Sequence, residues 1–230
     1  MGISIGIFKV EKLDLLGRIE RDKEIKIVSG QTSMSDFLDD AGLPSPTSTI
    51  KLAHKSENQI VYKVEHYTDT IRRPIRTWKS HLVVDSGYQE IANIEVVHDL
   101  QKNELYIMAK KDVVDEFADR LKTLKDLVKI EKYNFNLNIT QIQEILNVYG
   151  IWDKVSQGNI KVSAKFGSNV LESIRAGDST IAINMKVKMD DNEFDVTISR
   201  EGQISTHSGN ITFRELLRFF EILREELLGS

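Results

Sequence analysis

Residues 91–128 have the sequence IANIEVVHDLQKNELYIMAKKDVVDEFADRLKTLKDLV, in which two apolar stretches flank a polar turn and precede a helical pattern. Ile91–His98 and Glu104–Ala109 are rich in aliphatic residues on either side of Gln101–Asn103, which predicts two strands joined by a turn. From Asp112 to about Val128, apolar residues recur along one helical stripe, which predicts an amphipathic helix. This stretch therefore predicts antiparallel strands followed by a helix.

The second half of the chain ends in the same order. Phe194–Ile198, a turn and Gln203–Ser205 precede Thr212-x-x-Glu215, a capping box that opens a further helix. The sequence thus predicts an α+β protein with two antiparallel-sheet-plus-helix halves, residues 1–132 and 133–230. Two interpretations stay open, because the halves are either a structural duplication or two separate cases of a common strand–strand–helix arrangement.

The remaining elements follow from hydrophobic period and turn residues. Glu116 and Arg120 form an i,i+4 pair that supports their helix. Residues 70–78 contain Arg72-Arg73-Pro74 and predict a loop or a sheet edge. Strands are predicted over residues 3–10, 24–28, 59–67, 81–84, 159–166 and 180–189, helices over 35–41, 140–149 and 169–175, a turn at Ser86-Gly87, and a junction between the halves over 129–138.

Composition excludes several classes of protein. The 230 residues include no cysteine, so disulfides, thiolate nucleophiles and cysteine-ligated zinc are excluded. No signal peptide and no apolar stretch of about 20 residues is present, so we expect a soluble, cytoplasmic protein that does not enter a membrane.

Catalytic and cofactor-binding motifs are absent from the sequence. The five histidines have no metal-binding spacing, and no P-loop, dinucleotide fingerprint or nucleophile elbow occurs. We therefore expect no catalytic residue, no metal and no cofactor. One alternative stays open: Glu24-Ile25-Lys26, with Asp14 upstream, has the spacing found in metal-dependent nucleases, although any strand with a charged outer face has it too.

Basic and aromatic residues gather between Lys51 and His81, where seven Lys or Arg stand against three acids in a chain of formal net charge −4. Cations neutralise phosphate and aromatic rings stack on bases, so this composition is typical of nucleic-acid binding. An acidic protein partner or a solvated sheet face would also account for it. The candidate nucleic-acid-binding residues are Lys63, Arg72, Arg73, Arg76, Trp78 and Lys79.

A family resemblance covers roughly the last 40% of the chain. The segment Ile145-Leu146-Asn147-Val148-Tyr149-Gly150, the expected strand Ile160–Ala164, the short helix Val170–Ile174 and the ending Ile198–Ser205 follow one another in that order. This part resembles the C-terminal part of the RexA phage-exclusion protein and its relatives in the Kiwa antiphage system. The resemblance implies an α+β protein that binds DNA with little sequence preference in phage–host conflict, and it implies no catalytic residues.

We accordingly expect a non-catalytic nucleic-acid-binding protein, with DNA as the favoured ligand. A protein-interaction or assembly module and a metal-dependent nuclease are the alternatives. The helix at 212–228 is apolar over a broad face that includes Phe219 and Ile222, which is wider than one sheet needs. Either both sides of this helix are covered by its own chain or it forms a subunit contact, and we predict a homodimer through it.

Overall fold

The computed structural model describes residues 2–28, 46–68, 71–76, 83–88, 90–137, 147–153, 158–161, 180–189, 192–207 and 211–228. The chain forms two compact units. Unit 1 comprises Met1–Lys9, Glu104–Val114 and Glu131–Ser230, and unit 2 comprises Val10–Asn103 and Asp115–Ile130. Strand β1 (Ile3–Leu13) and helix α2 (Lys111–Lys122) each contribute to both units. Unit 1 resumes at Glu131, close to the expected boundary at 132, but it also takes in two earlier segments.

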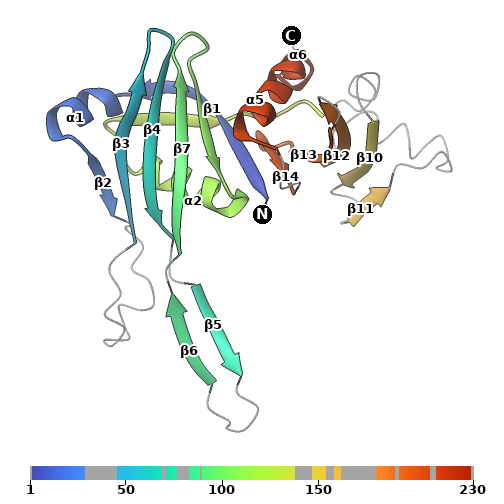
Figure 1. Ribbon diagram of the computed structural model, residues 1–230, viewed down its shortest axis with the longest axis horizontal. Helices are drawn as coiled ribbons and strands as arrows, with labels where there is room; N and C mark the ends of the chain where they lie inside the picture. Colours follow the sequence, from blue (N-terminus) through green and yellow to red (C-terminus); the bar gives the residue numbers. More distant parts are fainter. Residues whose placement is uncertain are drawn as a thin grey trace. The chain divides into compact units, whose positions relative to one another are not determined.

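Unit 1 contains an antiparallel sheet. Its strand order is β11-β10-β12-β13-β14-β1-β8 (Figure 1). The bounds are Glu104–Ala109 for β8, Asn147–Asp153 for β10, Gly158–Lys161 for β11, Thr180–Met189 for β12, Asn192–Ser199 for β13 and Gln203–Thr206 for β14. Antiparallel pairing with helices confirms the predicted α+β class.

The apolar face of this sheet is covered by α5 (Phe213–Ile222), which α6 (Arg224–Leu228) follows. Ile5 pairs in register with Met108, so Tyr106, two residues earlier in β8, lies on the same face as Ile5. Phe220 of α5 meets the Tyr106 ring edge to face, with ring centroids 6.4 Å apart. The core of unit 1 therefore lies between this face and α5.

A buried carboxylate joins α6 to the sheet. Glu104, at the start of β8, is fully buried, and Arg224 donates to both of its carboxylate oxygens. Tyr106 and Tyr133 each donate a hydroxyl to Glu104 at 2.6 Å. Burial acts to raise the pKa of Glu104, but Arg224 and the two tyrosines outweigh it and leave this pKa below its usual range. Burial and the neighbouring Glu104 raise the pKa of Tyr133 to about 12.

Unit 2 contains the strand order β7-β4-β3-β2, again antiparallel. The bounds are Ile25–Val28 for β2, Thr47–Lys55 for β3, Gln59–Tyr67 for β4 and Ile91–Asp99 for β7. Helix α1 (Leu15–Asp22) follows β1, and β9 (Val128–Lys132) pairs with β1. Between β4 and β7 the chain inserts β5 (Ile71–Arg76) and β6 (Val83–Tyr88), which form a two-stranded sheet of their own (Figure 1).

Several predicted elements are wrong. The helix predicted to reach Val128 ends at Lys122, where the hydroxyl of Thr123 donates to the Arg120 carbonyl and tight turns follow. Residues 128–132 form β9 because Val128 and Ile130 alternate with charged residues, a period of two that the predicted junction overlooked.

Other differences concern short segments. Ser86 and Gly87 lie within β6 and are not a turn, and residues 147–149 belong to β10 and not to a helix. The sequence interpretation missed α1 and β3 altogether. The helices predicted over 35–41 and 169–175, and residues 140–146, lie outside the described residues. Across the described ranges, no helix is long and apolar enough to cross a membrane.

Candidate functional site

The outer face of the unit 2 sheet carries Lys63, one of the predicted nucleic-acid-binding residues. Lys63 pairs in register with Lys51 on β3 and with Glu95 on β7. Glu24 lies 3.2 Å from the amine of Lys26 and 3.3 Å from that of Lys51, and these two lysines lower the pKa of its carboxyl. By register and ion pairing, this face carries Lys26, Lys51 and Lys63 together with Glu24, Glu65, Glu95 and Asp99. Carboxylates therefore offset the lysines on this face.

The remaining predicted residues fall in the insertion between β4 and β7. Arg72, Arg73 and Arg76 occupy three of the six positions of β5, opposite Gly87, Ser86 and Val83 of β6. Asp85 is the acid in the two strands of this ribbon. Trp78 and Lys79 lie outside the described residues. The local surplus of positive charge thus belongs to the β5–β6 ribbon, and not to the sheet that bears Lys63.

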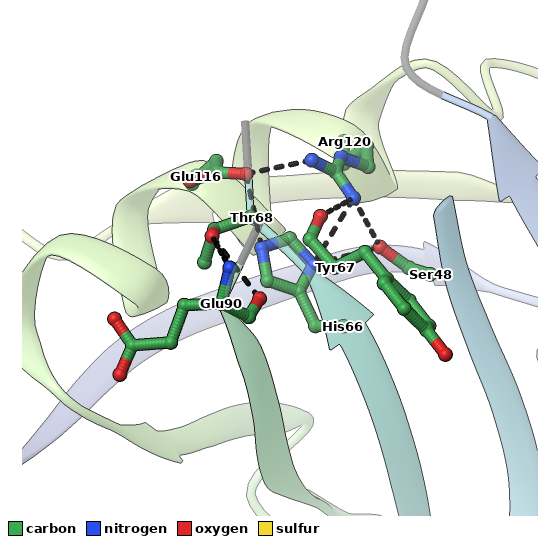
Figure 2. A network of polar contacts seen from close by, with 7 residues as sticks. All are labelled: Ser48, His66, Tyr67, Thr68, Glu90, Glu116 and Arg120. Atoms are coloured by element: carbon green, nitrogen blue, oxygen red, sulfur yellow. Dashed lines mark hydrogen bonds and ion pairs between the residues drawn. The ribbon is translucent and has the colours of Figure 1, made fainter. Parts of the chain in front are cut away.

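A buried polar network lies where β4 leads into this ribbon. The Ser48 hydroxyl of β3 lies 2.8 Å from Nδ1 of His66 on β4, and both side chains are fully buried. Arg120 reaches them from α2, and Figure 2 shows its guanidinium directed at both Ser48 and His66. Its Nη1 donates to the Ser48 hydroxyl oxygen at 3.0 Å and to the Tyr67 carbonyl at 2.8 Å.

Glu116 completes the network from the same helix. Nη2 of Arg120 donates to Glu116 Oε1 at 2.6 Å, so the i,i+4 pair predicted from the sequence is confirmed. Nε2 of His66 lies 3.1 Å from the same oxygen without the alignment of a hydrogen bond. Arg120 Nη1 also lies 3.3 Å from Nδ1 of His66, so Ser48, His66 and Arg120 contact one another in the core.

Thr68 and Glu90 connect the two ends of the inserted segment. The Thr68 amide and hydroxyl both donate to the Glu90 carbonyl, at 3.0 and 3.1 Å, and the Glu90 amide donates to the Thr68 hydroxyl at 3.0 Å (Figure 2). Arg120 holds the neighbouring Tyr67 carbonyl. The entry and exit of the ribbon are thus attached to each other, and the entry is attached to α2.

The network contains a serine, a histidine and a glutamate, as a hydrolytic triad does, but a substrate cannot reach its serine. A serine nucleophile must reach its substrate, whereas Ser48 is fully buried and its oxygen already accepts a hydrogen bond from Arg120. The arrangement fits a structural role, in which buried polar groups satisfy one another and fix the backbone at Tyr67.

The alternative nuclease site can also be compared with the structure. Glu24 is engaged by Lys26 and Lys51 on the open sheet face. Within the described ranges, no group of three or more His, Cys, Asp or Glu is arranged to hold a metal ion.

Sequence reasoning named the arginines of β5 as candidates and did not include the buried network that lies where β4 leads into the ribbon. Ser48 lies 18 positions before His66 and 72 positions before Arg120, so no local spacing joins them. The one available signal was the i,i+4 pair of Glu116 and Arg120. Comparisons of the chain with protein-family models, curated proteins and solved structures give no match.

Proposed function

We propose that this protein is a non-catalytic nucleic-acid-binding protein that contacts phosphates through the β5–β6 ribbon. The observation that carries this proposal is the placement of Arg72, Arg73 and Arg76 in one strand of a separate two-stranded antiparallel sheet. The major groove of DNA admits a two-stranded ribbon, and arginine binds phosphate with a planar fork of donors.

The charge distribution supports this ribbon over the sheet. Lys63 belongs to a face where carboxylates offset the lysines, while the ribbon has three arginines and Asp85. Contacts to phosphate carry no base information, so this mode of binding agrees with little sequence preference. A role in phage–host conflict rests on the resemblance of the C-terminal part of the chain to the RexA and Kiwa proteins.

The buried network also supports a binding role for the ribbon, because it orders the two ends of the inserted segment. A loop that is already ordered loses less conformational entropy when it binds. Arg120 on the Tyr67 carbonyl and the Thr68–Glu90 bonds order the two ends of the insertion. The network thus pre-positions the strands that carry the arginines.

The test is a fluorescence-anisotropy titration of labelled duplex DNA, single-stranded DNA and RNA over a series of salt concentrations. Replacing Arg72, Arg73 and Arg76 by Gln should flatten the slope of log affinity against log salt by roughly 3, because about 0.9 counterions are released per neutralised phosphate of B-DNA. The matched control replaces Lys26, Lys51 and Lys55 by Gln, which removes the same charge from exposed residues of the sheet.

The control variant should keep most of the wild-type slope. A ribbon variant with the wild-type slope, or equal losses in the two triple variants, would overturn the proposal. Arg120→Lys retains the charge but loses the planar fork, so it should weaken binding while leaving the salt slope unchanged. Its control is Lys122→Gln, on the exposed side of the same helix.

A homodimer through α5 is a second proposal, which one observation favours. Ile222 on this helix is 58% exposed, a large apolar side chain left open in the single chain. Phe219, by contrast, is 2% exposed and belongs to the core, so a dimer contact on α5 would use Ile222 and not Phe219.

A further inference from the structure

A cleft of about 760 Å³ opens on the polar face of the unit 1 sheet, opposite the face that α5 covers. Its size is that of a small-molecule site. Its charged and polar lining includes Ser4, Lys110, Lys111, Asn184, Asp195 and Ser205. None of them belongs to the ribbon or to its buried network, so the cleft is independent of the proposed nucleic-acid surface.

The floor of the cleft is a row of polar residues that crosses four neighbouring strands. Asn184 pairs in register with Thr197, Thr197 with Ser205, and Ser205 with Ser4. Residues that pair in this way lie side by side on one face of a sheet. A continuous line of hydroxyl and amide groups therefore runs beneath the cleft.

Two members of this row are buried although they are polar. Ser4 is 2% exposed and Asn184 is 9% exposed. Asn184 Oδ1 accepts the hydroxyl of Thr197 at 2.7 Å, and Asn184 also lines the cleft. An amide that uses its oxygen in this way can offer its N–H groups to an acceptor that enters the cleft.

One wall of the cleft is the first turn of α2. Lys110 and Lys111 line the cleft, and Gln203 of β14 donates to the Lys111 carbonyl at 3.4 Å. The sheet allows this close approach because Gly6 has no side chain: a Cβ there would lie 2.4 Å from Cγ1 of Val114. Two lysines at a helix N-terminus favour an anion at this wall.

We propose that this cleft binds a phosphate ester of a hydroxylated ring, the chemistry of ribose 5-phosphate. The phosphate binds at the first turn of α2, beside the amine of Lys111. The ring hydroxyls lie over Ser4, Ser205 and the Asn184 amide, where each can both donate and accept. The same group occurs in a free sugar phosphate and at the 5′-phosphorylated end of a nucleic-acid strand.

The experiment is isothermal titration calorimetry of the full chain with ribose, inorganic phosphate, ribose 5-phosphate and a short 5′-phosphorylated oligonucleotide. Ribose 5-phosphate should bind more tightly than ribose or phosphate alone, because it engages both the wall and the floor. Binding of the oligonucleotide more tightly than its unphosphorylated form would identify a strand end as the source. Equal binding of the two oligonucleotides would identify the free sugar phosphate.

Three variants separate the contacts. Lys111→Gln should weaken the binding of ribose 5-phosphate and of phosphate about tenfold and leave the binding of ribose unchanged, because one charge-assisted contact is lost. Asn184→Asp keeps an acceptor for Thr197 but replaces the amide donor, so it should weaken the binding of ribose and of ribose 5-phosphate. Lys9→Gln, an exposed lysine of unit 1 outside the cleft, should change nothing.

The proposal fails if ribose 5-phosphate shows no saturable binding up to about 10 mM, a concentration that covers even weak millimolar sites. It also fails if Lys9→Gln and Lys111→Gln weaken binding equally. The arginine variants of the ribbon should bind ribose 5-phosphate as the wild type does. Failure of the ribbon and failure of the cleft are therefore distinguishable.

Discussion

Arg224→Met should destabilise unit 1 by leaving a buried carboxylate without its cation. In the wild type Arg224 donates to both oxygens of Glu104, which is fully buried, and its guanidinium carbon lies 5.5 Å from the centre of the Phe220 ring. Methionine preserves the apolar contact with Phe220 but supplies no donor. Glu104 then keeps only the hydroxyls of Tyr106 and Tyr133 from its present set of donors.

The expected loss is about 3 kcal/mol in the free energy of unfolding near neutral pH. Removing one partner of a buried ion pair typically costs about 3–5 kcal/mol, and we take the low end because Glu104 keeps two tyrosine hydroxyls. The side chain of Arg224 is also 23% exposed, which weakens the pair that is lost. The double variant Glu104→Gln, Arg224→Met should lose less, because it leaves no charge behind.

The loss of stability in Arg224→Met should depend on pH, and the pKa of Glu104 decides in which direction. In the wild type the pKa of Glu104 lies below its ordinary value of 4.5, so its contribution is present above that pH and is lost as pH falls through the folded pKa. In Arg224→Met the arginine no longer lowers the pKa of Glu104, so burial becomes the largest influence on this pKa and raises it. The penalty is then largest at neutral pH and shrinks as pH falls towards 4.5.

The assay is urea denaturation followed by tryptophan fluorescence. The chain has two tryptophans, so a Trp78→Phe background leaves Trp152 of β10, within unit 1, as the reporter. Wild type, single and double variants are compared at about pH 7 and about pH 5. The reasoning is refuted if the single and double variants are equally stable at neutral pH, or if the deficit of the single variant grows as pH falls.

Three further predictions concern packing, capping and assembly. Gly6→Ala should cost about 1–3 kcal/mol by overpacking against Val114, and Val114→Ala in the same chain should recover part of that loss in urea denaturation, whereas an additive loss would contradict it. Thr212→Ala should cost about 1 kcal/mol by removing the side-chain half of the capping box, while Thr212→Ser, measured in parallel, should cost little. Phe219→Glu should unfold or aggregate, because the side chain of Phe219 lies in the core. Ile222→Glu should stay folded and, if α5 forms the dimer, should have a lower molecular mass than the wild type in light scattering. A wild-type monomer at micromolar concentration would exclude that dimer.

The sequence predicted correctly those strands and helix ends that are determined by their own local residues. The alternation of Gln59–Tyr67 placed β4 with its bounds, because one face of that strand is buried. The capping box was confirmed in atomic detail, since the Thr212 amide donates to Glu215 at 2.6 Å and the Glu215 amide donates to the Thr212 hydroxyl at 3.3 Å. The end of α2 could not be read in this way, because the apolar stripe continues into β9 with a period that fits both structures over a few residues.

The buried network of Ser48, His66 and Arg120 could not be predicted from local sequence signals. The network is built from a serine, a histidine and an arginine on three elements, and each residue is unremarkable in its own stretch of sequence. Only the pairing of β3 with β4, which sets Ser48 opposite His66, brings the first two together. β3 was itself missed because Lys51–Lys55 is exposed and lacks a hydrophobic period. A site that depends on register between strands is therefore hidden until both strands are known.

The basic segment of the chain shows why charge counted along a sequence is not the charge of a surface. The fold sets Lys63 in register with Glu95, on a face where carboxylates offset the lysines, and sets the arginines of β5 in a ribbon with Asp85. A lysine that already neighbours a carboxylate perturbs the ion atmosphere of a phosphate less than a cation without one. Lys63→Gln should therefore change the slope of log affinity against log salt less than Arg72→Gln does. A larger change for Lys63 would mean that nucleic acid lies on the sheet and not on the ribbon.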